Sequence, residues 1–229
     1  METVRDLADS ERERLCARLL QQQVVDQRRF LHYWRDLTLQ PAQIDTGYIG
    51  QMLVSLVTGL VGGGMRGKGL DMEDGSEIKS ANFLDSLDRR GAAAPRWNFQ
   101  ANNLPAMEAL LDVPAIYLCS IDVNLNDKVR VRVWRLRPAE HRIFAERYIR
   151  WIEDFGKPKL ADPRRPNANF QVFPPRPALD HTYARHGGGN VENGLPALMI
   201  ELEDGVGAEK IFHAEEDRSG TVTVELFAP

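Results

Sequence analysis

The chain has 229 residues, a formal net charge of −4 and 43% hydrophobic residues, which is enough apolar content for a sizeable core and excludes a wholly disordered protein. No run reaches the roughly 18 apolar residues of a membrane span, and the charged start "METVRDLADSERERL" lacks the apolar centre of a secretion signal. Cys16 and Cys119 stand in no paired spacing, which is typical of a reducing compartment. We therefore expect a cytoplasmic protein with no membrane partner.

Charge is distributed unevenly along the chain. Residues 128–165 contain twelve Lys or Arg and five Asp or Glu, a balance of +7. Residues 192–217 contain eight acids and one lysine, a balance of −7. Because the local field governs contact with a phosphate backbone, the net charge of −4 does not exclude a nucleic-acid partner.

The first half of the chain predicts two helices. Residues 9–38 carry apolar side chains at helical spacing, and Ser10 or Asp9 could cap the start of one long helix or of two. Thr46 opens a second helix, "TGYIGQMLVSLVTGL", which is apolar on most sides and is expected to be buried. Two short strands around an Asp-Gly turn follow, and then an irregular stretch at 83–114.

The second half predicts a hairpin, a helix and two late strands. Strands at 115–123 and 128–136 flank the turn "NLND", and a helix follows over 138–155. "NFQVFPPRP" and "HGGGN" frame an expected long loop, and "PALMIELE" and "TVTVELF" read as strands. The economical interpretation is one α/β domain with a mixed central sheet flanked by helices.

Several familiar motifs are absent or incomplete. "GGGMRGKGL" resembles a phosphate-binding loop, but Gly69 stands where Ser or Thr should hold magnesium, and the loop follows a helix instead of a strand. His181 and His186 are five residues apart, which does not suit two zinc ligands on one helix face, and no Cys-x-x-Cys pair exists. A G-x-S-x-G nucleophile elbow is also missing.

The strongest candidate site is the turn in "GLDMEDGSEIKSAN". A two-residue turn at Asp74 and Gly75 would point Asp71 away from the face that carries Glu77 and Lys79. A three-residue turn with a left-handed Gly75 would instead place Asp71 directly across from Glu77. The glycine falls where the second geometry needs it.

Two carboxylates on neighbouring strands repel each other unless a cation lies between them, and magnesium suits a few carboxylates, waters and a phosphate oxygen. Lys79 beside them could orient an attacking water and offset charge on the phosphate. The same residues also suit an ordinary solvated hairpin, because an acid followed by E-x-K is common by chance. The buried helix before the turn, its glycines and the basic hairpin after it favour the site.

The order of helix, strand with Asp, strand with E-x-K, strand, helix and strand is similar to the PD-(D/E)XK nuclease core. More closely, "GKGLDMEDGSEIKSAN" with "PRWNF", "RVRVWRL" and "NFQVFPPR" resembles the MamI family of type II restriction endonucleases over roughly residues 47–202. The resemblance implies a magnesium site with Asp71, Glu77 and Ile78 as ligands and Lys79 as the catalytic lysine. It also implies a helical extension at 1–45, a nuclease core at 46–202 and a C-terminal strand segment at 203–229.

The chain departs from that pattern in two places. Leu70 stands where the superfamily motif has proline, a position that varies widely. The preceding helix offers Gln51 in place of an outer-shell glutamate. Residues expected to contact DNA are Lys68, Asn82, Arg96, Trp97, Asn98, Arg130, Arg132, Asn169, Gln171 and Arg176.

The first hypothesis is therefore a magnesium-dependent endonuclease that cuts double-stranded DNA at a short recognition sequence, as a homodimer with a companion DNA methyltransferase. A structure-specific repair or recombination nuclease would use the same chemistry and the same fold. A non-catalytic DNA-binding module is the alternative from another class. All three core residues, Asp71, Glu77 and Lys79, are present, which favours catalysis.

Overall fold

The computed structural model describes residues 3–39, 44–64, 71–82, 96–123, 129–164, 167–175, 182–188 and 195–227. Its longer helices are α1 (Asp9–Leu20), α2 (Gln27–Thr38), α3 (Thr46–Thr58) and α5 (Arg142–Trp151). The shorter ones are η1 (Val4–Asp6), η2 (Gln21–Asp26), α4 (Leu104–Glu108), η3 (Ala109–Leu111), η4 (Ile152–Gly156) and α6 (Lys157–Ala161). The strands are β1 (Glu77–Ala81), β2 (Trp97–Ala101), β3 (Ile116–Asp122), β4 (Arg130–Leu136), β5 (Ala168–Val172), β6 (Tyr183–His186), β7 (Leu198–Glu201), β8 (Ala208–Glu216) and β9 (Val222–Leu226).

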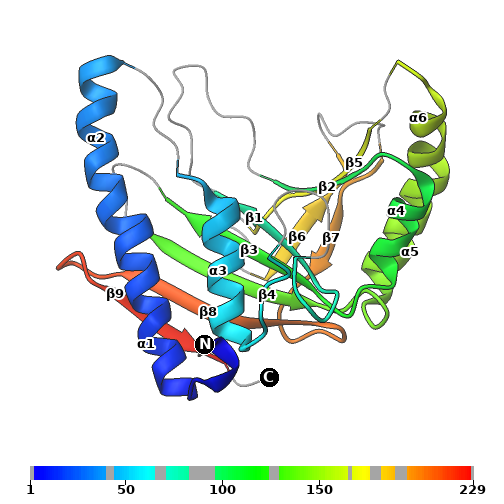
Figure 1. Ribbon diagram of the computed structural model, residues 1–229. Coiled ribbons are helices and arrows are strands. Elements are labelled where there is room, and N and C mark those ends of the chain that lie inside the picture. The colour runs from blue at the N-terminus through cyan, green and yellow to red at the C-terminus, as the bar shows by residue number, and fades with distance from the viewer. Residues whose placement is uncertain are drawn as a thin grey trace.

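The expected mixed central sheet is confirmed, and it has five strands in the order β1-β3-β4-β8-β9 (Figure 1). β1 runs parallel to β3, and the other neighbours are antiparallel. β1 is therefore an edge strand, whereas β4 lies in the middle of the sheet between β3 and β8. Smaller two-stranded sheets pair β2 with β5 and β6 with β7.

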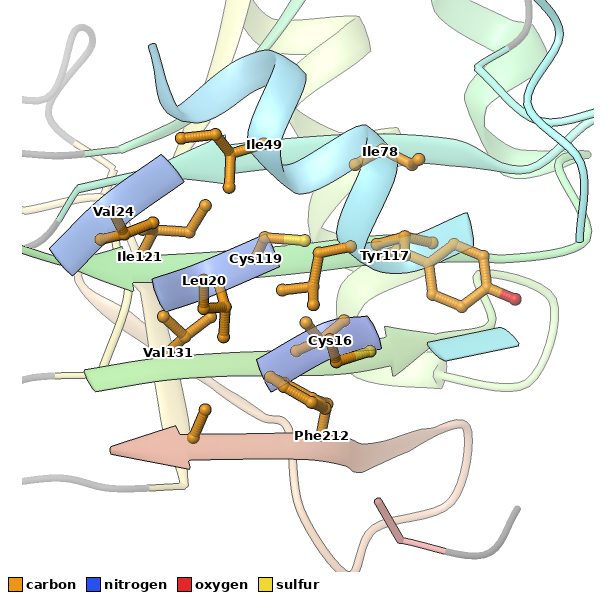
Figure 2. Packing of buried hydrophobic residues seen from close by; sticks show 14 of the residues in the cluster. Cys16, Leu20, Val24, Ile49, Ile78, Tyr117, Cys119, Ile121, Val131 and Phe212 are labelled. Carbon is orange, nitrogen blue, oxygen red and sulfur yellow. The ribbon is translucent and has the colours of Figure 1, made fainter. Parts of the chain in front are cut away.

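One face of the central sheet is covered by α1, η2 and α3. Cys16, Leu20 and Val24 from the first helical segment and Ile49 from α3 pack on strand residues such as Cys119 (Figure 2). Nearly all of this cluster is aliphatic or sulfur-containing. Burial also raises the pKa of the Cys16 and Cys119 thiols to about 12, so both remain neutral packing groups.

The opposite face is covered by α5 and by the β2–β5 pair, which we call the ribbon. Phe170 of β5 lies at its centre and makes edge contacts with Tyr148 and Trp151 of α5. His186 stacks on Phe170 with ring centroids 4.0 Å apart, and its burial lowers the pKa of the imidazole to about 4. The aromatic cluster thus fixes the ribbon beside the β1 edge of the sheet.

Several expectations from sequence are confirmed, and others are wrong. Residues 9–38 are helical throughout, with a π-helical segment in the middle. The predicted strands at 115–123 and 128–136 pair as β3 and β4. The stretch at 83–114 contains β2 and α4, "NFQVF" itself belongs largely to β5, and the expected loop up to "HGGGN" contains β6. The missed strand β8 joins β9 in the central sheet, where acidic side chains had obscured its apolar alternation.

The second helix is only half buried. Ile49, Leu53 and Val54 of α3 face the core, whereas Tyr48 and Met52 are exposed on its other side. The expectation of a helix buried on most sides was therefore wrong, because α3 covers the rim of the sheet and not its middle. None of the helices in the described segments has the length and apolarity needed to cross a membrane.

Candidate active site

The turn before β1 has the three-residue geometry. Gly75 has a φ of +90°, its N–H donates to the Met72 carbonyl at 3.1 Å, and the Met72 N–H donates to the Ser76 carbonyl at 3.2 Å. Glu73, Asp74 and Gly75 therefore form the loop, with glycine in the left-handed position that a side chain disfavours. The strand expected before the turn is reduced to a single bridge between Met72 and Gly62.

Asp71 is held against β1 by two hydrogen bonds. The Ile78 N–H donates to one carboxylate oxygen at 2.8 Å, and Gln51 Nε2 of α3 donates to the other at 3.0 Å. Because the N–H and C=O of one strand residue point the same way, the Ile78 carbonyl also faces this free edge. Its side chain turns into the core instead.

Glu77 and Lys79 share the other face of β1 and form an ion pair. Their side chains are 21% and 23% exposed, so solvent and a substrate can still reach them. Burial raises the pKa of the Glu77 carboxyl, Lys79 opposes this shift and the nearby charge of Asp71 adds to it. The Asp71 effect indicates that the two carboxylates lie within electrostatic range of each other.

Gly50 brings α3 close enough for Gln51 to reach Asp71. A Cβ at this position would clash with the Ser80 hydroxyl of β1 and would approach the Ser80 Cβ to 3.1 Å. The helix can therefore rest directly on the edge strand only because residue 50 lacks a side chain. Gln51 thus lies beside the predicted metal ligand Asp71, in the outer-shell position that the sequence suggested for it.

A cavity of about 660 Å³ opens beside Asp71 on the outer side of α3. Its lining consists of Tyr48, Gln51, Met52, Ser55, Gly62, Gly64 and Asp71. The described residues contain no cluster of three or more His, Cys, Asp or Glu that could hold a metal ion. Any cation at this edge would therefore depend on two carboxylates, a main-chain oxygen and waters.

Two of the expected DNA contacts are structural. Trp97 is fully buried, donates its indole N–H to the Cys119 carbonyl at 2.8 Å and packs edge-on against Trp134. The side-chain amide of Asn82 bonds both the N–H and the C=O of Val123, at 3.0 and 3.1 Å. The expectation for Trp97 was wrong because β2 turns the indole inward. Asn82 instead ties the end of β1 to the end of β3.

The expectation that Arg132 meets a phosphate is wrong, whereas Arg130 keeps 19% of its side chain exposed. Both guanidinium groups pair with the fully buried Asp122, and Arg132 also lies over the Trp134 ring at 4.8 Å. Arg132 is only 3% exposed, and its burial lowers the pKa of the guanidinium to about 10. The guanidinium groups of Arg130 and Arg132 thus share one acidic partner inside the protein.

The remaining candidates gather on the ribbon. Asn98 is exposed on β2, and its amide lies 3.4 Å from that of Asn169 on β5. Gln171 pairs in register with Asn98, and Arg96 is exposed just before β2. Lys68 and Arg176 lie outside the described residues.

Sequence reasoning missed Gln100, which is exposed two residues after Asn98 and pairs in register with Asn169. The outer face of the ribbon therefore presents four amide side chains and no described charge between them. The alternation in "WNFQA" could have revealed this face, since Trp97, Phe99 and Ala101 are the buried positions. The stretch was interpreted as irregular, so this alternation was overlooked.

Comparison with known proteins gives a match to one family and to a curated relative. Residues 33–214 match the sequence profile of the family described as MamI restriction endonuclease. The type II restriction enzyme MamI of Microbacterium ammoniaphilum is 35% identical over 161 residues, which cover 63% of this chain and 48% of that relative. The chain thus spans about half the length of this curated relative. No solved structure matches the chain.

Proposed function

Since this chain belongs to the MamI restriction endonuclease family, we propose that it hydrolyses phosphodiester bonds of double-stranded DNA within a short recognition sequence. The observation that supports this best is the convergence of Asp71, Glu77 and Lys79 on the free edge of β1. An edge strand leaves its outer side open, so a DNA backbone can approach the three groups together. The central sheet would then correspond to a PD-(D/E)XK core.

The proposed cofactor is magnesium, held by the Asp71 and Glu77 carboxylates and the Ile78 main-chain carbonyl. These donors are all oxygen atoms, which suits a hard cation that keeps several waters and a phosphate oxygen. The Glu77 carboxylate is buried beside a second acid, which raises its pKa. A bound cation would offset both effects because it stabilises the charged carboxylate. When bound, the ion would act as a Lewis acid on the scissile phosphate.

The protein's own groups would orient the reaction. Lys79 can release Glu77 when a cation binds, and its ammonium can then hold the attacking water and offset charge that develops on the phosphate. Gln51 would act as a positioning residue, because its bond to Asp71 sets the direction of the carboxylate. The ammonium already lies 5.8 Å from the Phe99 ring, which supports its side chain from the ribbon.

The ribbon is proposed as the element that contacts the recognition sequence. A two-stranded ribbon fits the major groove, and Asn and Gln can bond the edge of adenine through two hydrogen bonds. Asn98, Gln100, Asn169 and Gln171 supply such amides on one face, next to the strand that carries Lys79. Arg96, Lys68 and Arg176 are kept as proposed phosphate contacts.

The proposed assembly is a symmetric homodimer, because two sites related by a two-fold axis can cut both strands of a palindromic target. A companion DNA methyltransferase is expected to protect the host's own recognition sequences. The proposed compartment is the cytoplasm, where the enzyme would meet foreign DNA that has entered the cell.

Plasmid cleavage tests the proposal. The protein is incubated with plasmid DNA with and without Mg²⁺, and the products are separated on a gel. We expect discrete fragments that require the ion and that disappear with Lys79→Ala, while Lys157→Ala on the exposed surface of α6 cuts normally. Random degradation would indicate a less specific nuclease, and DNA binding without cleavage would indicate a non-catalytic module. Full activity of Lys79→Ala would refute the site.

A further inference from the structure

An exposed apolar stripe runs along α2. Its members are large side chains spaced at i, i+3, i+4 and i+7, followed by one residue at the helix end, and each is at least 56% exposed: Phe30, Tyr33, Trp34, Leu37 and Leu39. This spacing places the four helical residues on one face. We call this set the α2 stripe.

The α2 stripe has no packing partner among the described residues. Of the described side chains between residues 29 and 39, none is buried, and α2 projects away from the central sheet (Figure 1). Near its start α2 contacts the body through Arg28, whose guanidinium pairs with the buried Glu216 at 2.8 Å, and through Arg29, whose guanidinium lies against Gly220. Helices are stabilised mainly by packing an amphipathic face, so a stripe of this size left in water is costly.

We infer that a second copy of this chain covers the α2 stripe, with the two α2 helices antiparallel across a two-fold axis near Tyr33 and Trp34. In this arrangement Phe30 lies opposite Leu37 of the partner subunit, so the stripe is complementary to itself. The inference deepens the homodimer part of the proposed function by naming its surface. Tyr and Trp are also the residues that most often dominate such interfaces.

The area available suits a specific dimer. The three aromatic side chains bury roughly 150–250 Å² each when fully covered, so in a symmetric pair their exposed parts would contribute on the order of 700 Å². Leu37 and Leu39 add to this on both copies. The total approaches the roughly 1,000 Å² that a biological interface needs.

Charges beside the stripe favour the antiparallel orientation. Arg29 and Asp36 lie on the same flank of α2, two turns apart, and both are exposed. In an antiparallel pair related by a two-fold axis, the same flank of each helix lies on the same side, and the start of one helix faces the end of the other. Arg29 therefore approaches Asp36 of the partner subunit. The present pairs, Arg29 with Asp26 and Arg35 with Asp36, are surface contacts of small free energy and can exchange.

The same pairs argue against DNA as the occupant. Each arginine beside the stripe already has an acidic neighbour on the helix, so this surface lacks the concentrated positive charge that binds phosphates. Large apolar side chains with balanced flanking charge are instead typical of a protein interface.

Molar mass in solution tests the inference without any need for cleavage. Sedimentation velocity of the full chain over a range of concentrations should give a dimer, and Trp34→Glu should weaken dimerisation at least 100-fold. Glu keeps the helix propensity and is solvated in the monomer, so the thermal unfolding of the body should not change. Ile149→Glu, on the exposed side of α5, is the matched control and should remain a dimer.

Charge reversal tests the orientation. Arg29→Glu and Asp36→Arg should each weaken the dimer about tenfold, and the double variant should restore it. A wild-type protein that is monomeric at about 100 μM, or a dimer that survives Trp34→Glu, overturns the inference. If the wild-type protein is a monomer and Trp34→Glu loses DNA binding, the stripe is assigned to DNA instead. Magnesium-dependent cutting by a monomer would leave the proposed nuclease chemistry intact, so the two failures are distinguishable.

Discussion

β1 and β4 carry the same kind of pattern, two charged side chains separated by one apolar residue, and the fold uses them in opposite ways. In β1, Glu77 and Lys79 lie at the open edge of the sheet, partly exposed and next to Asp71. In β4, Arg130 and Arg132 lie in the middle of the sheet and converge on the buried Asp122. Strand position, and not the charge pattern, therefore separates a candidate site from an internal ion-pair network.

The difference also explains which charges can meet a substrate. Arg132 lies on a covered face of the sheet, so its charge must find partners inside the protein or incur a large desolvation cost. An edge strand keeps one side free, and a carboxylate there can exchange a lysine for a cation. Substitutions on the two strands should accordingly affect different properties.

The largest expected effect is the loss of cleavage on the edge strand. Asp71→Asn removes the charge of a proposed metal ligand, and because changes to groups that merely support a metal ligand cost 10–100-fold, we expect plasmid cleavage to fall more than about 100-fold. The melting temperature should shift little, because Asn still accepts one hydrogen bond. Asp154→Asn on the surface should cut normally, and equal loss there would point to misfolding instead.

The central strand should respond in stability. Arg132→Ala leaves Asp122 with only one arginine partner, so urea unfolding should show a loss of about 3 kcal/mol. The cleavage rate of the folded protein should stay within threefold. Arg142→Ala, which breaks an exposed pair, should cost less than about 0.5 kcal/mol. Normal stability together with loss of DNA binding in Arg132→Ala would restore the phosphate-contact interpretation.

A smaller effect is expected from Gln51, which touches the site through Asp71. Gln51→Ala removes one of the two hydrogen bonds that orient this carboxylate, and cleavage should fall roughly 10–100-fold. If Gln51 positions a metal ligand, raising the Mg²⁺ concentration should recover part of the rate, which a purely structural defect would not allow. Gln22→Ala, at an exposed position of η2, is the control.

The smallest effect concerns the turn that sets the register of β1. Gly75→Ala places a side chain at a φ of +90° and should destabilise the protein by about 1–2 kcal/mol. Gly62→Ala, where a Cβ would meet its nearest neighbour at 3.8 Å, should change thermal unfolding much less. Equal melting temperatures for the two variants would mean that the turn does not depend on glycine.

Much of the site could be predicted because its determinants are local. The loop of Glu73, Asp74 and Gly75 follows from the position of one glycine, and strand alternation puts Glu77 and Lys79 on one face. The helical pattern of 9–38 likewise depends on neighbouring residues. The expectation for Trp97 is wrong because it treats 83–114 as irregular and so leaves unused the alternation that places Trp97 with Phe99 and Ala101 on the buried face.

The sequence by itself determined the turn, the helices at 9–38 and 46–58, the hairpin of β3 and β4, and the identity of the groups near β1. Only the tertiary structure decided that β1 lies at an edge, that α3 brings Gln51 onto Asp71 through Gly50, and that Arg132 is enclosed. The physical reason is that edge and centre depend on strand order. β4 becomes central only because β8, distant in the chain, pairs with its second side.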